Sequence, residues 1–181
     1  MSDFIFEIND NEKKYLKQIA LLSIRARFEE IEYPKPPTEK MTEKLGAFVT
    51  LKKGDRLRGC IGHIAGDSPL WKTIIRMAPQ AAFNDPRFAP LKKEELDQVH
   101  LEISILSPLQ PLDDPSKIVP GRDGLLIRKG GSTGLLLPQV AAEWGWDRET
   151  FLAHTCRKAG LQADCWKEPA TEIFWFQAIV F

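Results

Sequence analysis

The chain has 181 residues, of which 43% are hydrophobic and 28% are charged, as is usual for a globular protein. Its 25 basic and 25 acidic side chains balance, so no overall positive field would attract nucleic acid. The N-terminal sequence MSDFIFEINDNEKK lacks the basic start and apolar run of a secretory signal, and no apolar stretch is long enough to cross a bilayer, so we expect a cytoplasmic protein with reduced cysteines.

The first predicted element is a helix that begins after Asn9. The Asn9 side chain can cap the helix, and Glu12 stands three residues later, where it completes a capping box. Apolar residues continue at helical spacing to Phe28, and Pro34 begins a proline-rich loop that cannot continue the helix. We therefore expect a helix that stops by Tyr33.

A hairpin and a second helix are predicted next. Residues 45–51 and 56–64 are strand-like and are separated by a turn at 53–55. Ser68 is the expected cap of the following helix, with proline at its first position, and the sequence NDPRF at 84–88 is expected to form a loop.

The second half of the chain is predicted to contain more strands than helices. The expected elements are a strand at 99–107, a hairpin of 124–128 with 134–137, a short helix after Pro138 and a helix from Asp147 to Gly160. Residues 171–181 are apolar on both faces, which is typical of a central, doubly covered strand. Hairpin-linked strands with helices at intervals predict an α+β fold with a mainly antiparallel sheet flanked by helices.

Three segments together resemble a known family. They are LRGCIG at 57–62, AAFNDPRFAPLKKEEL at 81–96 with ISILSP at 103–108, and GLLLPQVAAEWGWDRETFLAHTCRKAGL at 134–161. Because of these three segments, the chain (residues 1–181) resembles a single domain of the AMMECR-one family. The resemblance implies two unequal subdomains, a functional site at LRGCIG, and Memo-like and radical S-adenosylmethionine proteins as partners. It implies no assigned reaction.

The LRGCIG segment holds the cysteine whose setting invites chemistry. In a regular strand, Arg58 and Cys60 share one face, and a nearby arginine favours a thiolate. Gly59 and Gly62 leave the backbone bare, so a substrate or another chain segment can approach it. The alternative is a buried structural cysteine beside a β-bulge. Alternation places His63 on the opposite face from Cys60, which argues against a Cys-His dyad.

The NDPRF loop supplies two further candidates. Asp85 can serve as a base or orient Arg58, and Arg87 can bind an anionic substrate. The alternative is an Asx-turn at Asn84 or Asp85 with Arg87 paired locally. We expect Cys60 and Arg58 to project into a common cleft, with Asp85 or Arg87 nearby.

Three classes of function remain open from the sequence. A cysteine-dependent enzyme or modification factor would use Cys60 as its nucleophile. A non-catalytic protein-interaction module would use the shape of the LRGCIG segment to bind a partner. A nucleic-acid-binding regulator would use the basic residues around that segment. Scattered histidines and cysteines and the absence of glycine-rich phosphate loops predict no metal site and no bound cofactor. Cys156 and Cys165 are expected to be structural thiols.

Overall fold

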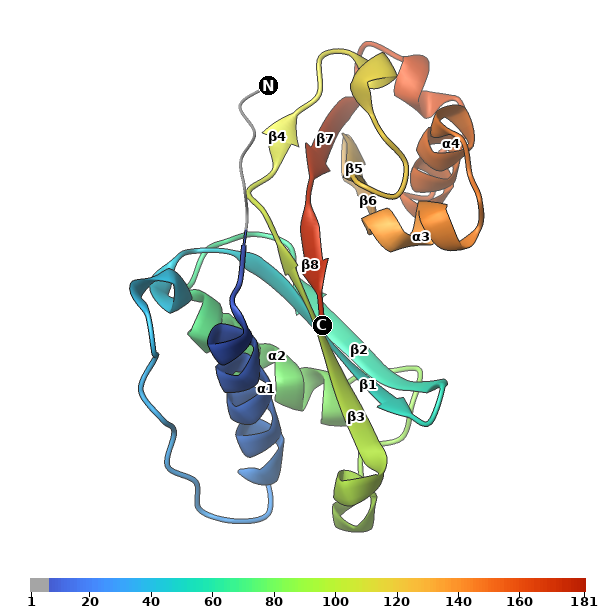
Figure 1. Ribbon diagram of the computed structural model, residues 1–181. Helices are drawn as coiled ribbons and strands as arrows, with labels where there is room; N and C mark the ends of the chain where they lie inside the picture. Colours follow the sequence, from blue (N-terminus) through green and yellow to red (C-terminus); the bar gives the residue numbers. More distant parts are fainter. Residues whose placement is uncertain (1–6) are drawn as a thin grey trace. The chain divides into compact units, whose positions relative to one another are not determined.

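The computed structural model describes residues 7–181 and divides into two compact units of unequal length (Figure 1). One unit extends to Leu106 and includes residues 179–181, and the other contains residues 107–178. Each has an antiparallel sheet and helices, which confirms the predicted α+β class. The first six residues, on which the signal-peptide prediction partly rests, lie outside the described range.

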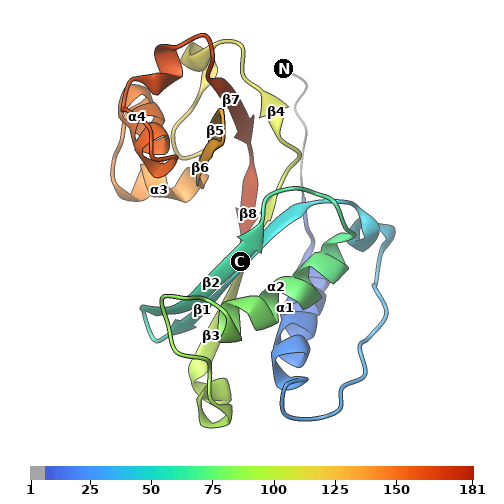
Figure 2. The same cartoon turned by 180° about the vertical axis from the view of Figure 1, so that it is seen from behind.

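The first unit is a four-stranded sheet covered on one face by two helices, with the strand order β2-β1-β3-β8 (Figures 1 and 2). Its elements are α1 (Asp10–Arg25), the 3-10 helix η1 (Glu39–Thr42), β1 (Gly46–Lys53), β2 (Arg56–His63), α2 (Leu70–Phe83), the 3-10 helix η2 (Lys93–Gln98), β3 (Val99–Leu106) and β8 (Ala178–Val180). Aliphatic residues of β1 and β3 face the helices and form the core, among them Val49, Leu51, Ile103 and Ile105.

The two helices begin differently from each other. The predicted capping box of α1 is present, since Glu12 N donates to Asn9 Oδ1 at 2.9 Å and Asn9 N donates to Glu12 Oε2 at 2.9 Å. This helix ends at Arg25, within the predicted limit. The predicted cap of α2 is wrong: Pro69 is the N-cap residue, and Ser68 hydrogen-bonds to the carboxylate of Asp67 instead.

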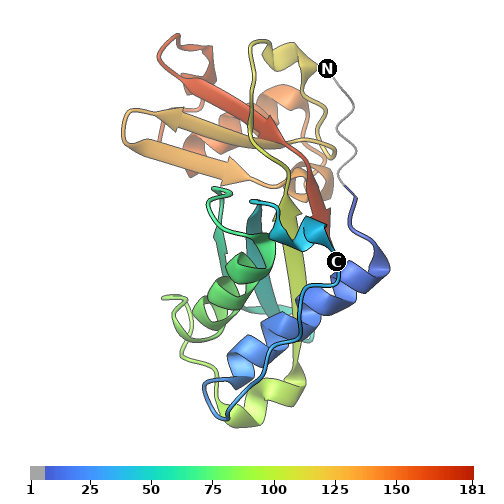
Figure 3. The ribbon, with the colours of Figure 1, turned by 90° about the vertical axis from the view of Figure 1, so that its left-hand side faces the viewer.

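The second unit has a four-stranded sheet in the order β4-β7-β5-β6, with helices α3 and α4 against one face (Figure 3). Its elements are β4 (Gln110–Pro111), the 3-10 helix η3 (Pro115–Lys117), β5 (Gly124–Lys129), β6 (Ser132–Leu136), α3 (Pro138–Glu143), α4 (Arg148–Lys158), the 3-10 helix η4 (Cys165–Lys167) and β7 (Glu172–Phe176). The predicted hairpin and both predicted helices of this region are therefore confirmed.

The prediction of one central strand over 171–181 is wrong. The segment forms two strands, β7 in the second sheet and β8 in the first, with Gln177 between them. Ser107 holds this break: Ser107 N donates to Gln177 O at 2.9 Å, and Gln177 N donates to Ser107 Oγ at 2.9 Å. A side-chain oxygen thus replaces a ladder partner where the chain changes sheets.

The expectation that all three cysteines are reduced is also wrong. Cys156 in α4 and Cys165 in η4 form a disulfide, with their Cα atoms 6.1 Å apart. Both residues are buried in the core of the second unit beside Phe151 and Leu152. Cys60 is therefore the free cysteine.

No helix within residues 7–181 has both the length and the apolar character needed to cross a membrane.

A β-bulge interrupts the hairpin of β1 and β2. Near the turn, Lys52 pairs with Leu57, but the next residue of β1, Leu51, pairs with Gly59. Arg58 is therefore the extra residue, and the register beyond it is shifted by one position. Because side chains alternate along a strand, this shift decides which face each later residue of β2 occupies.

The shift turns Gly59 toward α2. A Cβ atom on Gly59 would overlap the carbonyl oxygen of Ala81, whereas a Cβ atom on Gly131 would meet nothing within 4 Å. We expect Gly59→Ala to lower the free energy of unfolding by about 1–3 kcal/mol, because α2 must move away from the sheet. Gly131→Ala should leave stability nearly unchanged. Urea denaturation of both variants measures the difference, and equal stabilities would contradict the close packing.

The disulfide gives a prediction that thiol titration can check. Protein unfolded without reductant should expose one thiol per chain, that of Cys60, and three after reduction. Cys60→Ser should expose none before reduction. Three thiols in unreduced protein would contradict the bond between Cys156 and Cys165.

Candidate functional site

Cys60 lies on β2, which is an edge strand of its sheet. The loop that follows α2 runs beside this edge and is held by its own backbone. Leu91 N donates to Ala82 O at 2.8 Å, and Phe88 N donates to Asp85 O at 3.1 Å. The loop thereby brings Asp85, directly after the helix cap, to the backbone of Cys60.

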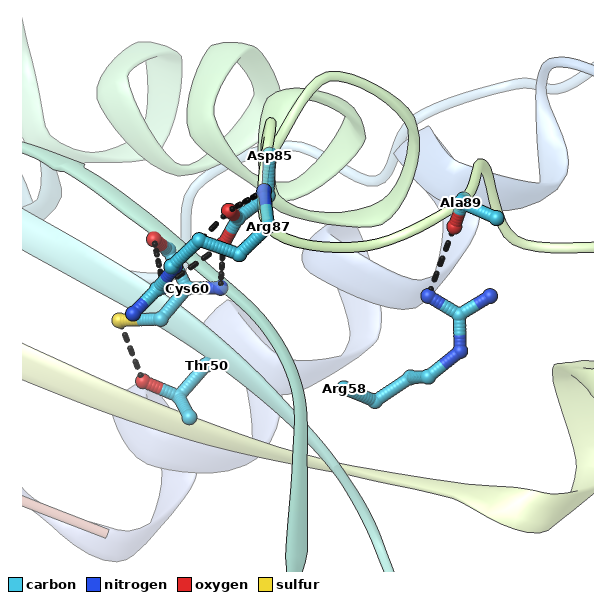
Figure 4. Close-up of polar contacts among 6 residues, drawn as sticks. All are labelled: Thr50, Arg58, Cys60, Asp85, Arg87 and Ala89. Atoms are coloured by element: carbon cyan, nitrogen blue, oxygen red, sulfur yellow. Dashed lines mark hydrogen bonds and ion pairs between the residues drawn. The ribbon is translucent and has the colours of Figure 1, made fainter.

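Asp85 and Arg87 bind the exposed backbone edge of Cys60 (Figure 4). Cys60 N donates to Asp85 Oδ2 at 2.9 Å, and Arg87 Nη2 donates to Cys60 O at 3.3 Å. The guanidinium also donates to the Asp85 carboxylate through Nε at 3.0 Å and Nη2 at 2.7 Å. One ion pair therefore satisfies both backbone groups that an edge strand leaves open at this residue.

The Asp85 carboxylate is held in its charged form. Its side chain is only 2% exposed, and it also accepts a hydrogen bond from Arg87 N at 3.1 Å, which is the predicted Asx-turn. Hydrogen bonds from the Arg87 side chain, and then from the Cys60 and Arg87 backbones, hold the pKa of Asp85 well below its usual range despite burial. Such a carboxylate positions its neighbours and is a poor base at neutral pH.

The Cys60 side chain lies beside the hydroxyl group of Thr50 and the guanidinium of Arg87. Thr50 Oγ1 donates to Cys60 Sγ at 3.1 Å, from the position of β1 directly opposite in the sheet. The positive charge of Arg87 interacts electrostatically with Cys60, and the two side chains lie together in Figure 4. Cys60 as a residue is partly exposed. A hydroxyl donor and a guanidinium are groups that stabilise negative charge on sulfur.

Arg58 does not belong to this cluster, so the prediction that it shares a cleft with Cys60 and is oriented by Asp85 is wrong. It donates to Glu95 through Nε at 3.1 Å and Nη2 at 3.0 Å, and through Nη1 to Ala89 O at 2.9 Å. In Figure 4 its guanidinium points away from Cys60. The reason is the bulge, because the extra residue in a bulge leaves the regular alternation. Arg87 supplies the cation that Arg58 was expected to supply.

The two glycines of the segment are packing positions. Gly59 is buried beneath Ala81 of α2, and a Cβ atom on Gly62 would overlap the ring of Phe48. Both close neighbours belong to the chain itself. The space beside these glycines, which a substrate was expected to enter, is therefore filled by α2 and by Phe48.

His63 stays apart from Cys60, as the alternation predicted. Beyond Arg58 the register is regular, with Gly62 opposite Phe48 and His63 opposite Ala47. His63 Nε2 lies 2.9 Å from Asp67 Oδ2 and so has a carboxylate partner of its own.

Three of the four lysines and arginines of the hairpin, namely Lys52, Lys53 and Arg58, contact carboxylates. Lys52 lies 2.8 Å from Glu102, and both Arg58 and Lys53 contact Glu95. These pairs offset part of the positive charge that a nucleic-acid-binding regulator would use, whereas Arg56 has no ion pair among residues 7–181. Within the described part of the chain, no group of three or more histidine, cysteine, aspartate or glutamate side chains is placed to hold a metal ion.

Comparisons with known sequences and structures identify the same family as the three segments of the sequence did. The sequence profile of the AMMECR1 family matches residues 17–181. The chain belongs to the AMMECR1 family. AMMECR1 relatives include PF1979 of Pyrococcus furiosus, 44% identical over 98% of this chain and 90% of that protein, and a protein of Methanothermobacter thermautotrophicus, 43% identical over 96% and 95%. The crystal structure of the uncharacterized protein PH0010 from Pyrococcus horikoshii has a TM-score of 0.86 and 42% identity, covering 97% of this chain and 93% of that one.

Thr50 and Glu95 were not found from the sequence, whereas the Asx-turn with a locally paired Arg87 was one of the two alternatives for its loop. Thr50 would face Gly59 in an unbulged hairpin with the observed turn, and only the register shift brings it opposite Cys60. Glu95 accepts a hydrogen bond from Lys92 N at 3.0 Å, but lysine is not a helix-capping residue, so no local signal in the sequence marked this position. Its bond to Arg58 joins positions far apart in the sequence.

Glu95 gives this AMMECR1 domain a pH-dependent stability. Hydrogen bonds from Arg58, and then from Lys92 N, lower the pKa of Glu95 to about 2. A depressed carboxylate pKa adds stability that is complete above the ordinary value of about 4.3 and disappears as the pH falls toward about 2. We expect Glu95→Gln to lower the urea midpoint at pH 7 and to flatten its fall between about pH 4 and 2.

The matched control is Glu94→Gln, since Glu94 is an exposed neighbour whose side chain has no ion pair within residues 7–181. It should retain the pH profile of the unmodified protein. Identical flattening in both variants would show that the Glu95 pair does not carry the effect.

Proposed function

We propose that this AMMECR1 protein is a cysteine-dependent enzyme or modification factor in which Cys60 is the nucleophile. The observation that carries the proposal is the environment of the sulfur: it accepts a hydrogen bond from Thr50 at 3.1 Å and lies beside the guanidinium of Arg87. Cys60 is also the free cysteine of a chain whose other two are bonded to each other. A hydroxyl donor and a cation beside a partly exposed cysteine are features of a cysteine nucleophile.

The proposed reaction is transfer of an acyl or alkyl group to sulfur. The Cys60 proton passes to solvent, the thiolate attacks the electrophilic carbon, a carbon–sulfur bond forms, and the leaving group departs with its bonding electrons. Thr50 and Arg87 hold the sulfur in place. Asp85 is a positioning residue, because it binds Arg87 and the Cys60 backbone rather than the sulfur.

Arg87 is also the proposed anchor for an anionic part of the substrate. Its side chain is 55% exposed, and its contacts with Asp85 and Cys60 use only Nε and Nη2. The remaining nitrogen, Nη1, keeps two N–H donors beside the sulfur, with the planar geometry that recognises carboxylate or phosphate. The proposed substrate class is therefore an electrophile that carries a negative charge.

Memo-like and radical S-adenosylmethionine proteins are proposed as partners, with the family resemblance as the support. Co-purification of this chain with a co-expressed Memo-like protein, compared with an unrelated protein of similar size, tests this part separately.

Alkylation by iodoacetamide tests the nucleophile directly. The native, unreduced protein should be labelled at Cys60, and Arg87→Gln should slow labelling at pH 7 by about threefold or more, because the neighbouring positive charge is lost. Arg87→Lys should retain most of the rate, since it keeps the charge. Thr50→Val should also slow labelling, because it removes the hydroxyl donor at similar volume.

Arg58→Gln is the matched control, because it removes an arginine two residues from Cys60 whose guanidinium binds Glu95. It should label at the rate of the unmodified protein, and melting curves of every variant will show that each is folded. Slow labelling of Arg58→Gln together with normal labelling of Arg87→Gln would overturn the assignment of Arg87 as the cation of the site.

A further inference from the structure

A second surface lies on the first unit, formed by α1, η2 and the beginning of β3. It is a shallow groove of about 710 Å³. Aliphatic side chains supply its apolar part, namely Leu21, Leu96, Val99 and Leu101. All four are partly exposed, so the groove is an apolar surface that the first unit leaves incompletely covered.

The groove adjoins an open edge of the sheet. On the side away from β1, β3 is paired as far as Ile103, whose N–H and C=O exchange hydrogen bonds with Phe181 at 2.9 and 3.1 Å. Backbone groups of alternate residues point to the same edge of a strand, so those of Leu101 and Val99 point outward as well. No residue from 7 to 181 pairs with them on that side. Two consecutive ladder positions are therefore open beside an apolar groove.

Positive charge surrounds this edge. Lys14, Lys17 and Arg25 line the groove from α1, against a single carboxylate, Asp97. Lys17 Nζ lies 5.7 Å from the centre of the Phe181 ring, directly beside the last paired position. The remaining lining residues, Gln18 and His100, add no negative charge.

One of these cations is incompletely satisfied. Arg25 Nη2 lies 3.4 Å from Asp97 Oδ1, whereas Arg25 Nε is buried and has no hydrogen-bond partner among the described residues. The side chain as a whole is partly exposed, so the charge of the guanidinium remains available to an occupant of the groove. The positive charge of the lining therefore favours an anionic occupant.

We propose that this groove binds a short, extended, acidic segment of a partner protein, which adds to β3 as an antiparallel strand beyond Phe181. Its backbone pairs with Leu101 and Val99, its apolar side chains enter the groove, and its flanking carboxylates meet Lys14, Lys17 and Arg25. The main-chain pairing supplies affinity, and the charges select acidic sequences. This surface is separate from Cys60, so the proposal does not depend on the proposed chemistry.

The test uses a fluorescein-labelled peptide, Glu-Glu-Val-Thr-Val-Glu-Glu, titrated with the full chain by fluorescence anisotropy. Binding is expected, and the combined change Lys14→Glu and Lys17→Glu should weaken it by about fivefold or more, as for loss and reversal of two exposed ion pairs. The control, Lys35→Glu with Lys44→Glu, alters net charge equally at exposed sites outside the groove and should bind as the unmodified protein does.

Two modified peptides separate strand addition from simple charge attraction. N-methylation of both valines removes the N–H groups needed for pairing, and replacement of glutamate by lysine reverses the charge; each should abolish binding. Unchanged binding of either modified peptide would overturn the proposal. Equal weakening by the two double variants of the protein, Lys14→Glu with Lys17→Glu and Lys35→Glu with Lys44→Glu, would also overturn it. A dimer of the chain that forms through this edge, detected by sedimentation and broken by Lys14→Glu with Lys17→Glu, would identify a second copy as the occupant and also overturn it.

Discussion

One extra residue in β2 determines the geometry of the candidate site. In an unbulged hairpin with the observed turn, Cys60 would lie opposite Val49, whose side chain is in the core beneath the helices. The bulge at Arg58 shifts the register by one residue, so Cys60 lies opposite Thr50 on the other face, and Gly59 takes the place against α2. A shift of one position exchanges the two faces of a strand, and here it moves Cys60 from a packed position to a partly exposed one.

The Asp85–Arg87 pair then fixes what the bulge has placed. An edge strand is free to slip or to pair with another chain, and its open backbone groups need partners. At Cys60 these partners are a buried carboxylate and a guanidinium from the loop after α2. The same guanidinium lies beside the sulfur, so one residue both closes the strand edge and supplies the local positive charge. The structural role of Arg87 is therefore joined to the chemical role proposed for it.

Local patterns in the sequence were sufficient for most elements. The capping box of Asn9 and Glu12, the first hairpin and the helix capped by Asp147 all depend on residues close together in the chain, and all are present. The break at Gln177 was missed because its cause is the side chain of Ser107, far away in the sequence. Apolar character alone does not show where a strand changes sheets.

The sequence by itself determined the α+β class and the family, because these depend on periodicity, turn residues and motif order. It also placed Asp85 and Arg87 near Cys60. Tertiary structure alone decided which arginine accompanies the sulfur, because a bulge turned Arg58 toward Glu95 and left Arg87 to take its place. It also decided the bond between Cys156 and Cys165. Register shifts and long-range contacts arise from packing between segments distant in the chain, which local patterns do not encode.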